Sequence, residues 1–441
     1  MAKPANRICG ITVRGFKSIR TEQHLDIRPL TVLAGANSSG KSSFMQPLLL
    51  LKQTLESPGD PGALLLDGPH VRFTTTGQVL SYGRGQETCR EFGVRIDLLD
   101  QRSLELVFQP ETGKGFDLLS MTYRSDEGTT VIAPELTQDE ILKLLPEPWK
   151  KMSAELTRGE KTSFHWVVRR ERCFFVLELG GESRKRTFPF PPYGLSPSQF
   201  FVPHIQGVVH LPGLRGNPRR TYPKTAGGPH FQGTFELYAA SVIARWQSNG
   251  GGQELRDLAN ALETMGLTWK VKAQPVDDTQ VELKVGRLPH AKQGGAQDLV
   301  NIADVGFGVS QSLPVLVALL VARPGQLVYL EQPEIHLHPL AQRRLAGVFR
   351  DAVARGVVAV LETHSPMILR EVQTLIAKGE LHKEDVAMHW FMRDNRGETT
   401  VRTADLDDKG AWGDWPEDFD QTELEAEREY LDMVEVREAG K

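Results

Sequence analysis

Cysteine is scarce in this sequence, with three residues among 441, and the three are far apart: Cys9, Cys89 and Cys173. They form no C-x-x-C pair and no even set, which argues against a disulfide framework and against a cysteine zinc site. Because such usage suits a reducing compartment, we expect a cytoplasmic protein.

Long apolar runs, an excess of one charge and a sustained repeat are also lacking. No uninterrupted apolar stretch reaches the roughly 18 residues of a membrane span, and residues 1–6 have no apolar signal core. The formal net charge is −4, so any surface for nucleic acid must be a local patch. No heptad pattern persists, which excludes a long coiled-coil arm. The sequence predicts a globular protein of two or three lobes with no place in a membrane.

Apolar patterning predicts an α/β fold with a mixed, mainly parallel sheet. Strand patterns at 8–19 and 29–33 precede a glycine-rich turn and an apolar helix at 44–51. Strand and helix patterns alternate again from 298 to 375, as a parallel sheet requires. Between these regions lie charged strand patterns at 91–99, 103–108 and 164–178, a short helix at 138–145 and a return to a buried strand at 199–211. The predicted parts are an N-terminal lobe (1–89), an inserted β-rich lobe (90–200), a C-terminal lobe (201–404) and a small acidic tail (405–441).

A glycine-rich motif lies between the second strand pattern and the apolar helix. It fulfils G-x-x-x-x-G-K-[ST] with Gly35, Ala36, Asn37, Ser38, Ser39, Gly40, Lys41 and Ser42, and Ser43 follows. The glycines let successive N–H groups surround phosphate oxygens, Lys41 neutralises terminal phosphates, and the Ser42 hydroxyl can ligate Mg²⁺. Chance would give such a match in about one chain of this length in a hundred. The motif predicts a site for ATP and Mg²⁺, and Pro47 predicts a kink in the following helix.

A second polar cluster follows the apolar strand pattern at 326–330 and contains Glu331, Gln332 and Glu334. In a phosphate-loop ATPase, a carboxylate at such a strand end orders the Mg²⁺ shell, and the next residue polarises the attacking water. We assign these roles to Glu331 and Gln332. Glutamine can hold a water but cannot take its proton, so we expect slow hydrolysis, with Glu334 as the nearest alternative base. The other interpretation is that these acids only favour the start of a helix.

Histidines stand near both strand ends. His364 follows the strand pattern at 357–361, where its imidazole can reach a terminal phosphate or the attacking water, or can bond to its own loop. His336 and His338 flank a leucine near carboxylates, which suggests a metal site. Because residues two apart face apart on a helix, packing or a subunit contact is the favoured interpretation.

A second glycine and hydroxyl cluster, at residues 304–312, precedes the apolar helix pattern at 313–321. Its glycines and helix start can bind an anion. Alternatively, Ser310 or Ser312 caps the helix, and this interpretation is preferred for the segment taken alone.

Taken in chain order, these elements resemble the ABC/SMC/RecF superfamily of ATPases. Residues 35–42 match its Walker A motif, residues 308–312 a diverged signature motif, Glu331 the Walker B carboxylate, and His364 the switch histidine. The order of the motifs is the specific part of this resemblance.

The resemblance implies a head-to-tail homodimer, or a higher homo-oligomer, that encloses ATP and Mg²⁺. Each ATP would be held by Lys41 of one copy and Ser310 of the other. Gln332 stands where the superfamily has glutamate, which implies a slow ATPase or an ATP-locked clamp. Gln78 is the candidate for the glutamine that senses the phosphate in this superfamily.

The segments 330–339 and 362–365 resemble more closely the compact AAA-type ATPases related to OLD proteins. Many of these are encoded in prokaryotic anti-phage operons such as Septu and PARIS. Residues 410–419, which include Asp414, Trp415 and Pro416, resemble a small C-terminal domain of some of them. An OLD-type nuclease would carry a Toprim domain beyond His364. The resemblance therefore implies a sensor or scaffold that acts with a separately encoded effector, a nuclease or a toxin.

Two other functions stay open at this point. The first is a RecF-like clamp that binds DNA when it binds ATP. It would use Arg215, Arg219 and Arg220 as a phosphate-facing or DNA-facing patch, although a solvated loop explains these arginines nearly as well. The second is a scaffold without hydrolysis, in which ATP only joins two subunits, and Gln332 is its main support.

Overall fold

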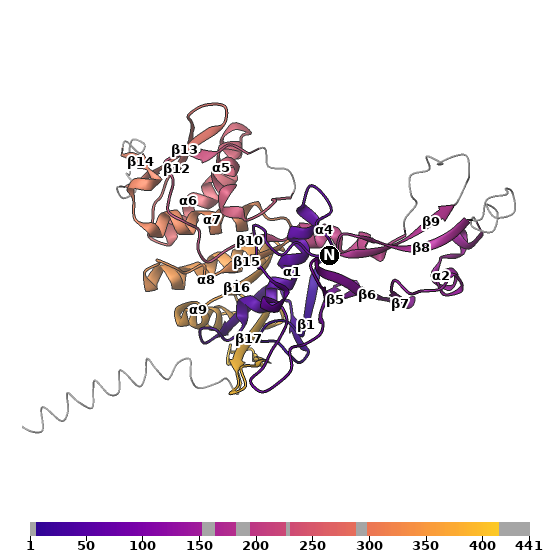
Figure 1. Cartoon of the computed structure of the whole chain (residues 1–441). Helices are drawn as coiled ribbons and strands as arrows, with labels where there is room; N and C mark the ends of the chain where they lie inside the picture. Colours follow the sequence, from indigo (N-terminus) through magenta and orange to yellow (C-terminus); the bar gives the residue numbers. More distant parts are fainter. Residues whose placement is uncertain (1–5, 152–163, 182–194, 226–229, 288–297, 414–441) are drawn as a thin grey trace, which may run out of the picture.

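The structure is a computed structural model that describes residues 6–151, 164–181, 195–225, 230–287 and 298–413 (Figure 1). Its centre is a six-stranded sheet with the order β10-β15-β16-β3-β17-β18. Neighbouring strands from β10 to β17 are parallel, and β18 is antiparallel to β17. This confirms the predicted mixed, mainly parallel sheet. The strands are β3 (Leu30–Gly35), β10 (Val209–Leu211), β15 (Leu327–Glu331), β16 (Val358–Glu362), β17 (Val386–Arg393) and β18 (Thr399–Thr403).

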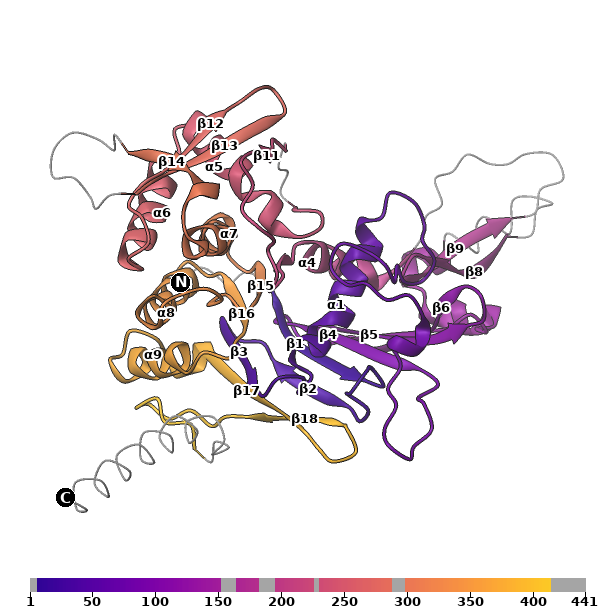
Figure 2. The same cartoon turned by 60° about the vertical axis from the view of Figure 1, so that its left-hand side comes forward.

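Helices cover both faces of this sheet, which is why its central strands are mainly apolar. On one face lie α7 (Phe307–Val321), α8 (Pro339–Ala354) and α9 (Pro366–Ala377), stacked side by side in Figure 2. Their apolar side chains form one core with alternate residues of the strands, such as Val32 and Leu330. The other alternate residues, such as Leu33 and Tyr329, belong to a second core on the opposite face.

That second core is built around α1 (Lys41–Glu56), which lies between the parallel sheet and an antiparallel sheet. The antiparallel sheet has the order β2-β1-β4-β5-β6-β7. Its β4 pairs with β1, so the sheet joins residues on both sides of the predicted boundary at residue 90. Its strands are β1 (Ile8–Arg14), β2 (Gln23–Asp26), β4 (Phe92–Leu98), β5 (Ser103–Glu111), β6 (Gly115–Ser125) and β7 (Gly128–Ile132).

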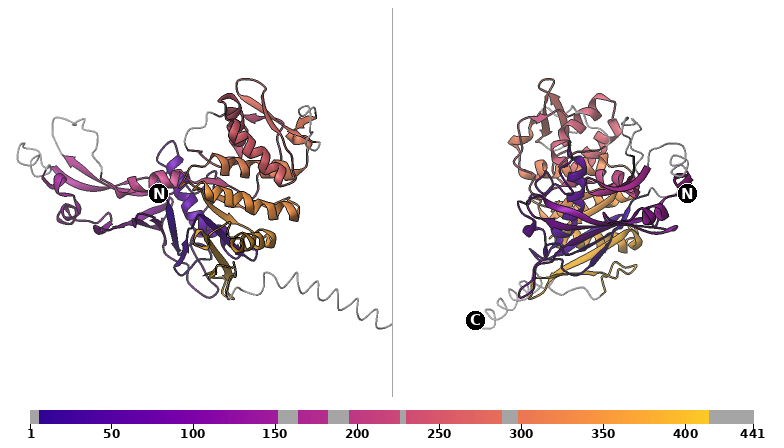
Figure 3. Two further views of the ribbon diagram at one scale, coloured as in Figure 1. Left: turned by 180° about the vertical axis from the view of Figure 1, so that it is seen from behind. Right: turned by 45° about the vertical axis from the view of Figure 1, so that its right-hand side comes forward.

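Two smaller units flank the sheets. A hairpin of β8 and β9 extends to one side together with the short helix α2 (Figures 1 and 3), and a small sheet of β11 to β14 packs with α5 and α6 beyond α7. The other α-helices and strands of the described residues are α2 (Gln138–Leu144), β8 (Phe164–Glu171), β9 (Phe174–Gly181), α4 (Val202–Gln206), β11 (Tyr222–Pro223), α5 (Ala239–Ser248), α6 (Gly252–Thr264), β12 (Val271–Pro275), β13 (Gln280–Gly286) and β14 (Leu299–Asn301).

Several further expectations can be compared with this fold. The longest helices that the structure describes, α1 and α8, have 16 residues each, which agrees with the predicted lack of a long coiled coil. Helix α1 continues through Pro47 to Glu56. No helix in the described part of the chain is long and apolar enough to span a bilayer. The acidic tail beyond residue 413, with Asp414, Trp415 and Pro416, lies outside the described residues.

Candidate functional site

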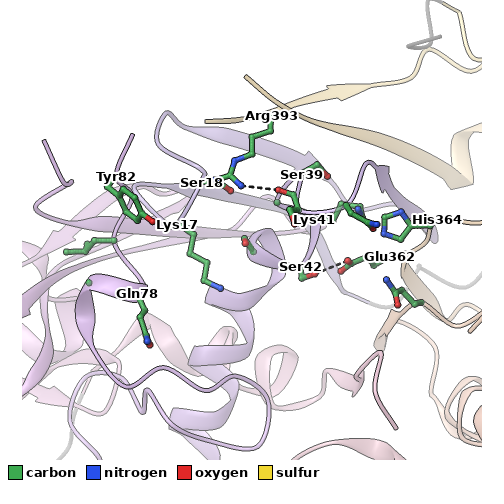
Figure 4. Close-up of a pocket in the computed structure, with 17 residues that line it drawn as sticks. Lys17, Ser18, Ser39, Lys41, Ser42, Gln78, Tyr82, Glu362, His364 and Arg393 are labelled. Carbon is green, nitrogen blue, oxygen red and sulfur yellow. Dashed lines mark hydrogen bonds between the residues drawn. The ribbon is translucent and has the colours of Figure 1, made fainter. Parts of the chain in front are cut away.

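A cavity of about 780 Å³ opens where the carboxyl ends of β3, β16 and β17 meet the start of α1 (Figure 4). Most of the predicted phosphate loop lines this cavity, together with Gln332, His364 and the candidate sensing residue Gln78. The lining residues are Lys17, Ser18, Asn37, Ser38, Ser39, Gly40, Lys41, Ser42, Ser43, Gly77, Gln78, Leu80, Tyr82, Gln332, Glu362, His364 and Arg393. The fold thus brings segments that are far apart in sequence to one site.

The loop between β3 and α1 has a backbone that requires its two motif glycines. Gly35 and Gly40 have φ angles of 141° and 105°, which only glycine adopts readily. A Cβ atom at Gly35 would lie 2.4 Å from the carbonyl oxygen of Phe391, and one at Gly40 would lie 2.4 Å from Thr399 Oγ1. The loop therefore holds its shape only with glycine at both positions, and α1 begins directly after it.

Two buried side chains of this loop fit a phosphate ligand. Lys41 is 3% exposed, and its Nζ donates hydrogen bonds to the carbonyl oxygens of Gly35 and Ala36 at 3.0 and 2.8 Å. Burial lowers the pKa of Lys41, and nearby carboxylates oppose this shift. Ser39 is 2% exposed, and its Oγ has no hydrogen-bond partner among the described residues. A buried hydroxyl without a partner is costly, and a phosphate oxygen would supply one.

Positive charge predominates around the cavity. Lys17, Lys41 and Arg393 contribute cations, and Glu362 is the acidic side chain among the described lining residues. Arg393 reaches the loop itself, because its Nη1 donates to the carbonyl oxygen of Ser38 at 3.4 Å. Such a balance suits a polyphosphate anion. Lys17 and Arg393 were not predicted as site residues, since neither belongs to a sequence motif.

Glu362 is the carboxylate that contacts the phosphate loop. It ends β16, next to β3, and its Oε1 accepts a hydrogen bond of 2.8 Å from Ser42 Oγ. Its Oε2 accepts a hydrogen bond of 3.0 Å from the buried Tyr329 hydroxyl. Sequence reasoning missed this residue, although its position at the end of an apolar strand was a signal.

Glu331, the predicted Mg²⁺ carboxylate, ends β15, one strand further from the loop than Glu362. Its Oε1 is hydrogen bonded to His210 Nε2 at 3.1 Å, and its Oε2 accepts a bond of 3.1 Å from the Gly213 N–H. Burial raises the pKa of Glu331, but His210, the Gly213 N–H and the charge of Arg215 together outweigh burial and hold the pKa below its usual value. Glu331 is therefore ionised at neutral pH.

A chain of buried polar groups runs from Glu331 back to α1. His210 Nδ1 lies 3.0 Å from His70 Nδ1, so one of these atoms donates the proton and the other accepts it. His70 Nε2 is in turn hydrogen bonded to Glu56 Oε2 at 3.3 Å, and Glu56 Oε1 accepts from Lys52 Nζ at 2.5 Å. Burial lowers the pKa of His70 to about 4, which keeps the ring neutral. This chain of hydrogen bonds fixes the His210 ring against Glu331.

The predicted catalytic residues lie at the same edge of the sheet. Gln332 adopts a φ of 43°, and its N–H donates to the carbonyl oxygen of Glu362 at 2.7 Å. Glu334 is 8% exposed, and its Oε1 accepts from Thr363 Oγ1 at 2.7 Å and from the His364 N–H at 2.9 Å. Burial, with the charge of Lys41, lowers the pKa of His364, so its imidazole is mostly neutral at pH 7. Glu334 thus positions the loop that carries His364.

The predicted signature segment does not reach this cavity within one chain. Helix α7 begins at Phe307 with Gly306 as its N-cap residue, and no side chain caps it, so the capping role considered for Ser310 or Ser312 is wrong. Ser310 is 8% exposed, and its Oγ donates to the Phe307 carbonyl oxygen at 3.1 Å. The exposed residue lies directly before the segment, where Phe307 at the start of α7 is 47% exposed.

Arg215 turns inward, which neither interpretation of the arginine patch expected. Its Nη2 donates to the carbonyl oxygens of Glu331 and Gln332 at 2.8 and 3.2 Å. Burial lowers its pKa to about 10. The side chain therefore braces the end of β15, while Arg219 and Arg220 remain exposed.

The pair His336 and His338 has packing contacts. His338 is the N-cap residue of α8, where its Nδ1 accepts from the Leu340 N–H at 3.3 Å. The His336 ring lies 5.3 Å from the Phe307 ring. Within the described part of the chain, no group of three or more His, Cys, Asp or Glu residues could hold a metal ion. Mg²⁺ needs no such group, because one or two carboxylates with hydroxyls, phosphates and waters suffice, and the surroundings of Ser42 offer that donor set.

The fold and the site together define an α/β protein with a phosphate loop that suits a nucleotide. The chain belongs to the family described as "AAA domain, putative AbiEii toxin, Type IV TA system", whose model matches residues 30–370. This match confirms the predicted AAA-type ATPase domain.

Solved structures of SMC heads are similar to this chain at low identity. An SmcHead bound to the C-winged helix domain of ScpA has 11% identity and a TM-score of 0.49, covering 91% of this chain and 98% of that chain. An Smc head domain with an extended coiled coil bound to the C-terminal domain of ScpA, from Pyrococcus furiosus, has 12% identity and a TM-score of 0.42, covering 91% and 97%. The SMC head domain from Thermotoga maritima has 8% identity and a TM-score of 0.38, covering 91% and 100%. No curated protein sequence matches the chain.

Proposed function

We propose that the chain binds ATP with Mg²⁺ in this cavity, dimerises around the nucleotide and hydrolyses it slowly. The observation that carries the proposal is the preformed phosphate loop, with Lys41 buried against its carbonyl groups and the Ser39 hydroxyl without a hydrogen-bond partner among the described residues. When bound, Mg²⁺ would neutralise charge on the phosphates, and Ser42 with a strand-end glutamate would hold it.

Four side chains of the site, Lys41, Gln332, Glu334 and His364, have tasks that their positions support. Lys41 exchanges its bonds to the Gly35 and Ala36 carbonyls for bonds to terminal phosphates. Gln332 orients a water without taking its proton, which accounts for slow turnover. The neutral His364 faces the same cavity, where it can accept a hydrogen bond from that water, and Glu334 fixes its backbone.

Dimerisation would complete the site. Because Ser310 lies outside the cavity of its own chain, its predicted contact with ATP requires a second copy. The exposed start of α7 at Gly306 and Phe307, directly before the signature segment, is the part that a second copy can present. A helix start carries unpaired N–H groups and partial positive charge, which suit a terminal phosphate.

At the level of the cell, we propose a cytoplasmic ATP-dependent sensor or scaffold of an anti-phage defence assembly, with a separately encoded nuclease or toxin as effector. Two lines support this role: the resemblance of the strand-end segments to OLD-related ATPases, and the toxin and toxin–antitoxin system in the family's description. A non-hydrolysing scaffold is the second candidate, because Gln332 replaces the usual base. Arg215 points inward and is not available to contact DNA, which weakens the case for a DNA clamp.

Binding of a fluorescent ATP analogue to the purified chain tests the proposal. We expect Lys41→Ala to weaken binding at least about tenfold, because the buried ammonium is the main charge facing the terminal phosphates. Lys114→Ala is the matched control: this lysine is 73% exposed and pairs with Glu111 on the β5–β6 turn. Equal affinity in wild type and Lys41→Ala would contradict the assignment of this cavity.

A further inference from the structure

Two glutamates end neighbouring parallel strands, and only one of them contacts the phosphate loop. Glu331 and Glu362 are register partners in the β15–β16 pair, so their side chains lie at the same edge of the sheet. Both Glu331 oxygens are engaged by His210 and the Gly213 N–H. Glu362 instead accepts its hydrogen bond from Ser42.

The surroundings of Glu362 leave its charge without a direct counterion. The residue is 6% exposed, and its two described partners, Ser42 and Tyr329, are neutral hydroxyls. Among the described residues Glu362 forms no ion pair, and Lys41 donates its short bonds to backbone carbonyls. A buried carboxylate is costly unless a cation or several hydrogen bonds compensate it.

The proximity of Glu331 adds to this cost. Glu331 is the register partner of Glu362 on the neighbouring strand, and its negative charge disfavours a second negative charge at Glu362. Two like charges at one edge of a sheet, Glu362 buried and Glu331 25% exposed, would be stabilised by a cation bound near both. A hard divalent cation with oxygen ligands fits this position.

We propose that Glu362 is a magnesium-site carboxylate, which holds Mg²⁺ together with Ser42, either directly or through one of its waters. This inference rests on the proposed function and deepens it, because it assigns the metal site a residue to which the sequence analysis gave no role. Glu331 then acts from the neighbouring strand as the second carboxylate. Mg²⁺ keeps several waters in such sites, so both glutamates can contribute without a dedicated protein cage.

Mn²⁺ in place of Mg²⁺ gives a readout that is independent of hydrolysis. The full chain is saturated with a non-hydrolysable ATP analogue, and free Mn²⁺ is titrated by electron paramagnetic resonance. Glu362→Gln keeps the shape of the side chain and removes its charge. We expect it to weaken Mn²⁺ binding about tenfold or more, the scale typical of substitutions in and around metal sites, while binding of the analogue in EDTA stays within about twofold of wild type.

Tyr329→Phe is the matched control, because it removes a hydrogen bond from the same carboxylate and keeps the charge. We expect its Mn²⁺ affinity to fall by less than about fivefold, the scale of one lost hydrogen bond from a neutral hydroxyl, well short of the loss in Glu362→Gln. Glu362→Asp, which keeps the carboxylate on a shorter arm, should retain part of the affinity, and it replaces Glu362→Gln in the comparison if that variant does not fold.

Three results would overturn the inference. Unchanged Mn²⁺ affinity in Glu362→Gln, with normal binding of the analogue, removes the metal role of Glu362 alone. An equal loss in Tyr329→Phe would show that packing of the cluster, and not the charge, sets the affinity. If the wild type fails to bind the analogue with or without metal, the proposed function itself fails, and the metal role fails with it.

Discussion

The buried ion pair of Lys52 and Glu56 ends the chain of hydrogen bonds that runs to Glu331. Breaking this ion pair should destabilise the protein strongly. The Lys52 side chain is 0% exposed and that of Glu56 is 8% exposed. Lys52 also donates to the carbonyl oxygens of Gln206 and Phe231 at 2.8 and 3.2 Å. Glu56→Gln preserves the volume of the side chain and removes the only charge that pairs with this ammonium among the described residues.

Removing one partner of a buried ion pair costs about 3–5 kcal/mol, because the other charge stays buried without compensation. The lower end of this range of free energies applies here, because Lys52 keeps two carbonyl partners and can lose its proton. Burial already lowers the pKa of Lys52, and Glu56 is what opposes this shift. We therefore expect Glu56→Gln to reduce the free energy of unfolding by about 3 kcal/mol.

Urea unfolding followed by circular dichroism measures this loss, and a double-mutant cycle assigns it to the pair. Lys52→Met removes the ammonium and keeps an apolar stem of similar length. The double variant should be more stable than the sum of the two single losses predicts, by about 1–3 kcal/mol. A loss below about 1 kcal/mol in Glu56→Gln, or additive effects in the cycle, would refute the reasoning.

Three further predictions concern buried histidines, the water-facing glutamine and the phosphate loop. Burial lowers the pKa of His70 and His389 to about 4, below the usual 6.5, so the unfolded chain protonates first on acidification. The free energy of unfolding should then fall by about 1.4 kcal/mol per pH unit for each ring between pH 6.5 and 4, and a flat urea-unfolding profile would contradict this. Gln332→Glu restores a general base and should raise phosphate release at least about tenfold; an unchanged rate would argue for the non-hydrolysing scaffold. Gly40→Ala should abolish binding of the ATP analogue because its Cβ would meet Thr399, whereas Gly59→Ala, with no atom within 4 Å of its Cβ, should bind normally.

The elements with strong local signals were predictable from the sequence. The phosphate loop, α1 and the strands ending in Glu331 and Glu362 all lie where apolar runs end in glycine or acidic residues. Turns that lack such signals could not be predicted from the sequence. The predicted strand at 164–178 is a hairpin that turns at Arg172, which has a φ of 52°. This turn contains no glycine, asparagine or proline that would have predicted it.

Long-range contacts explain the rest of what the sequence does not reveal. The pairing of β4 with β1 depends on contacts that periodicity does not encode. The Ser42–Glu362 bond joins residues 320 positions apart, and His210 meets His70 across 140 positions. Such groups carry no local pattern, so only the fold reveals that they surround one site.

The mass of the protein in solution, with and without Mg²⁺-ATP, tests the central claim most directly. We expect the wild type to shift from one chain of 49.1 kDa to twice that mass when Mg²⁺-ATP is added. The Lys41→Ala variant should keep the mass of one chain. A wild type that binds ATP and keeps its single-chain mass, or a Lys41→Ala variant that doubles its mass equally, would contradict an ATP-enclosing dimer.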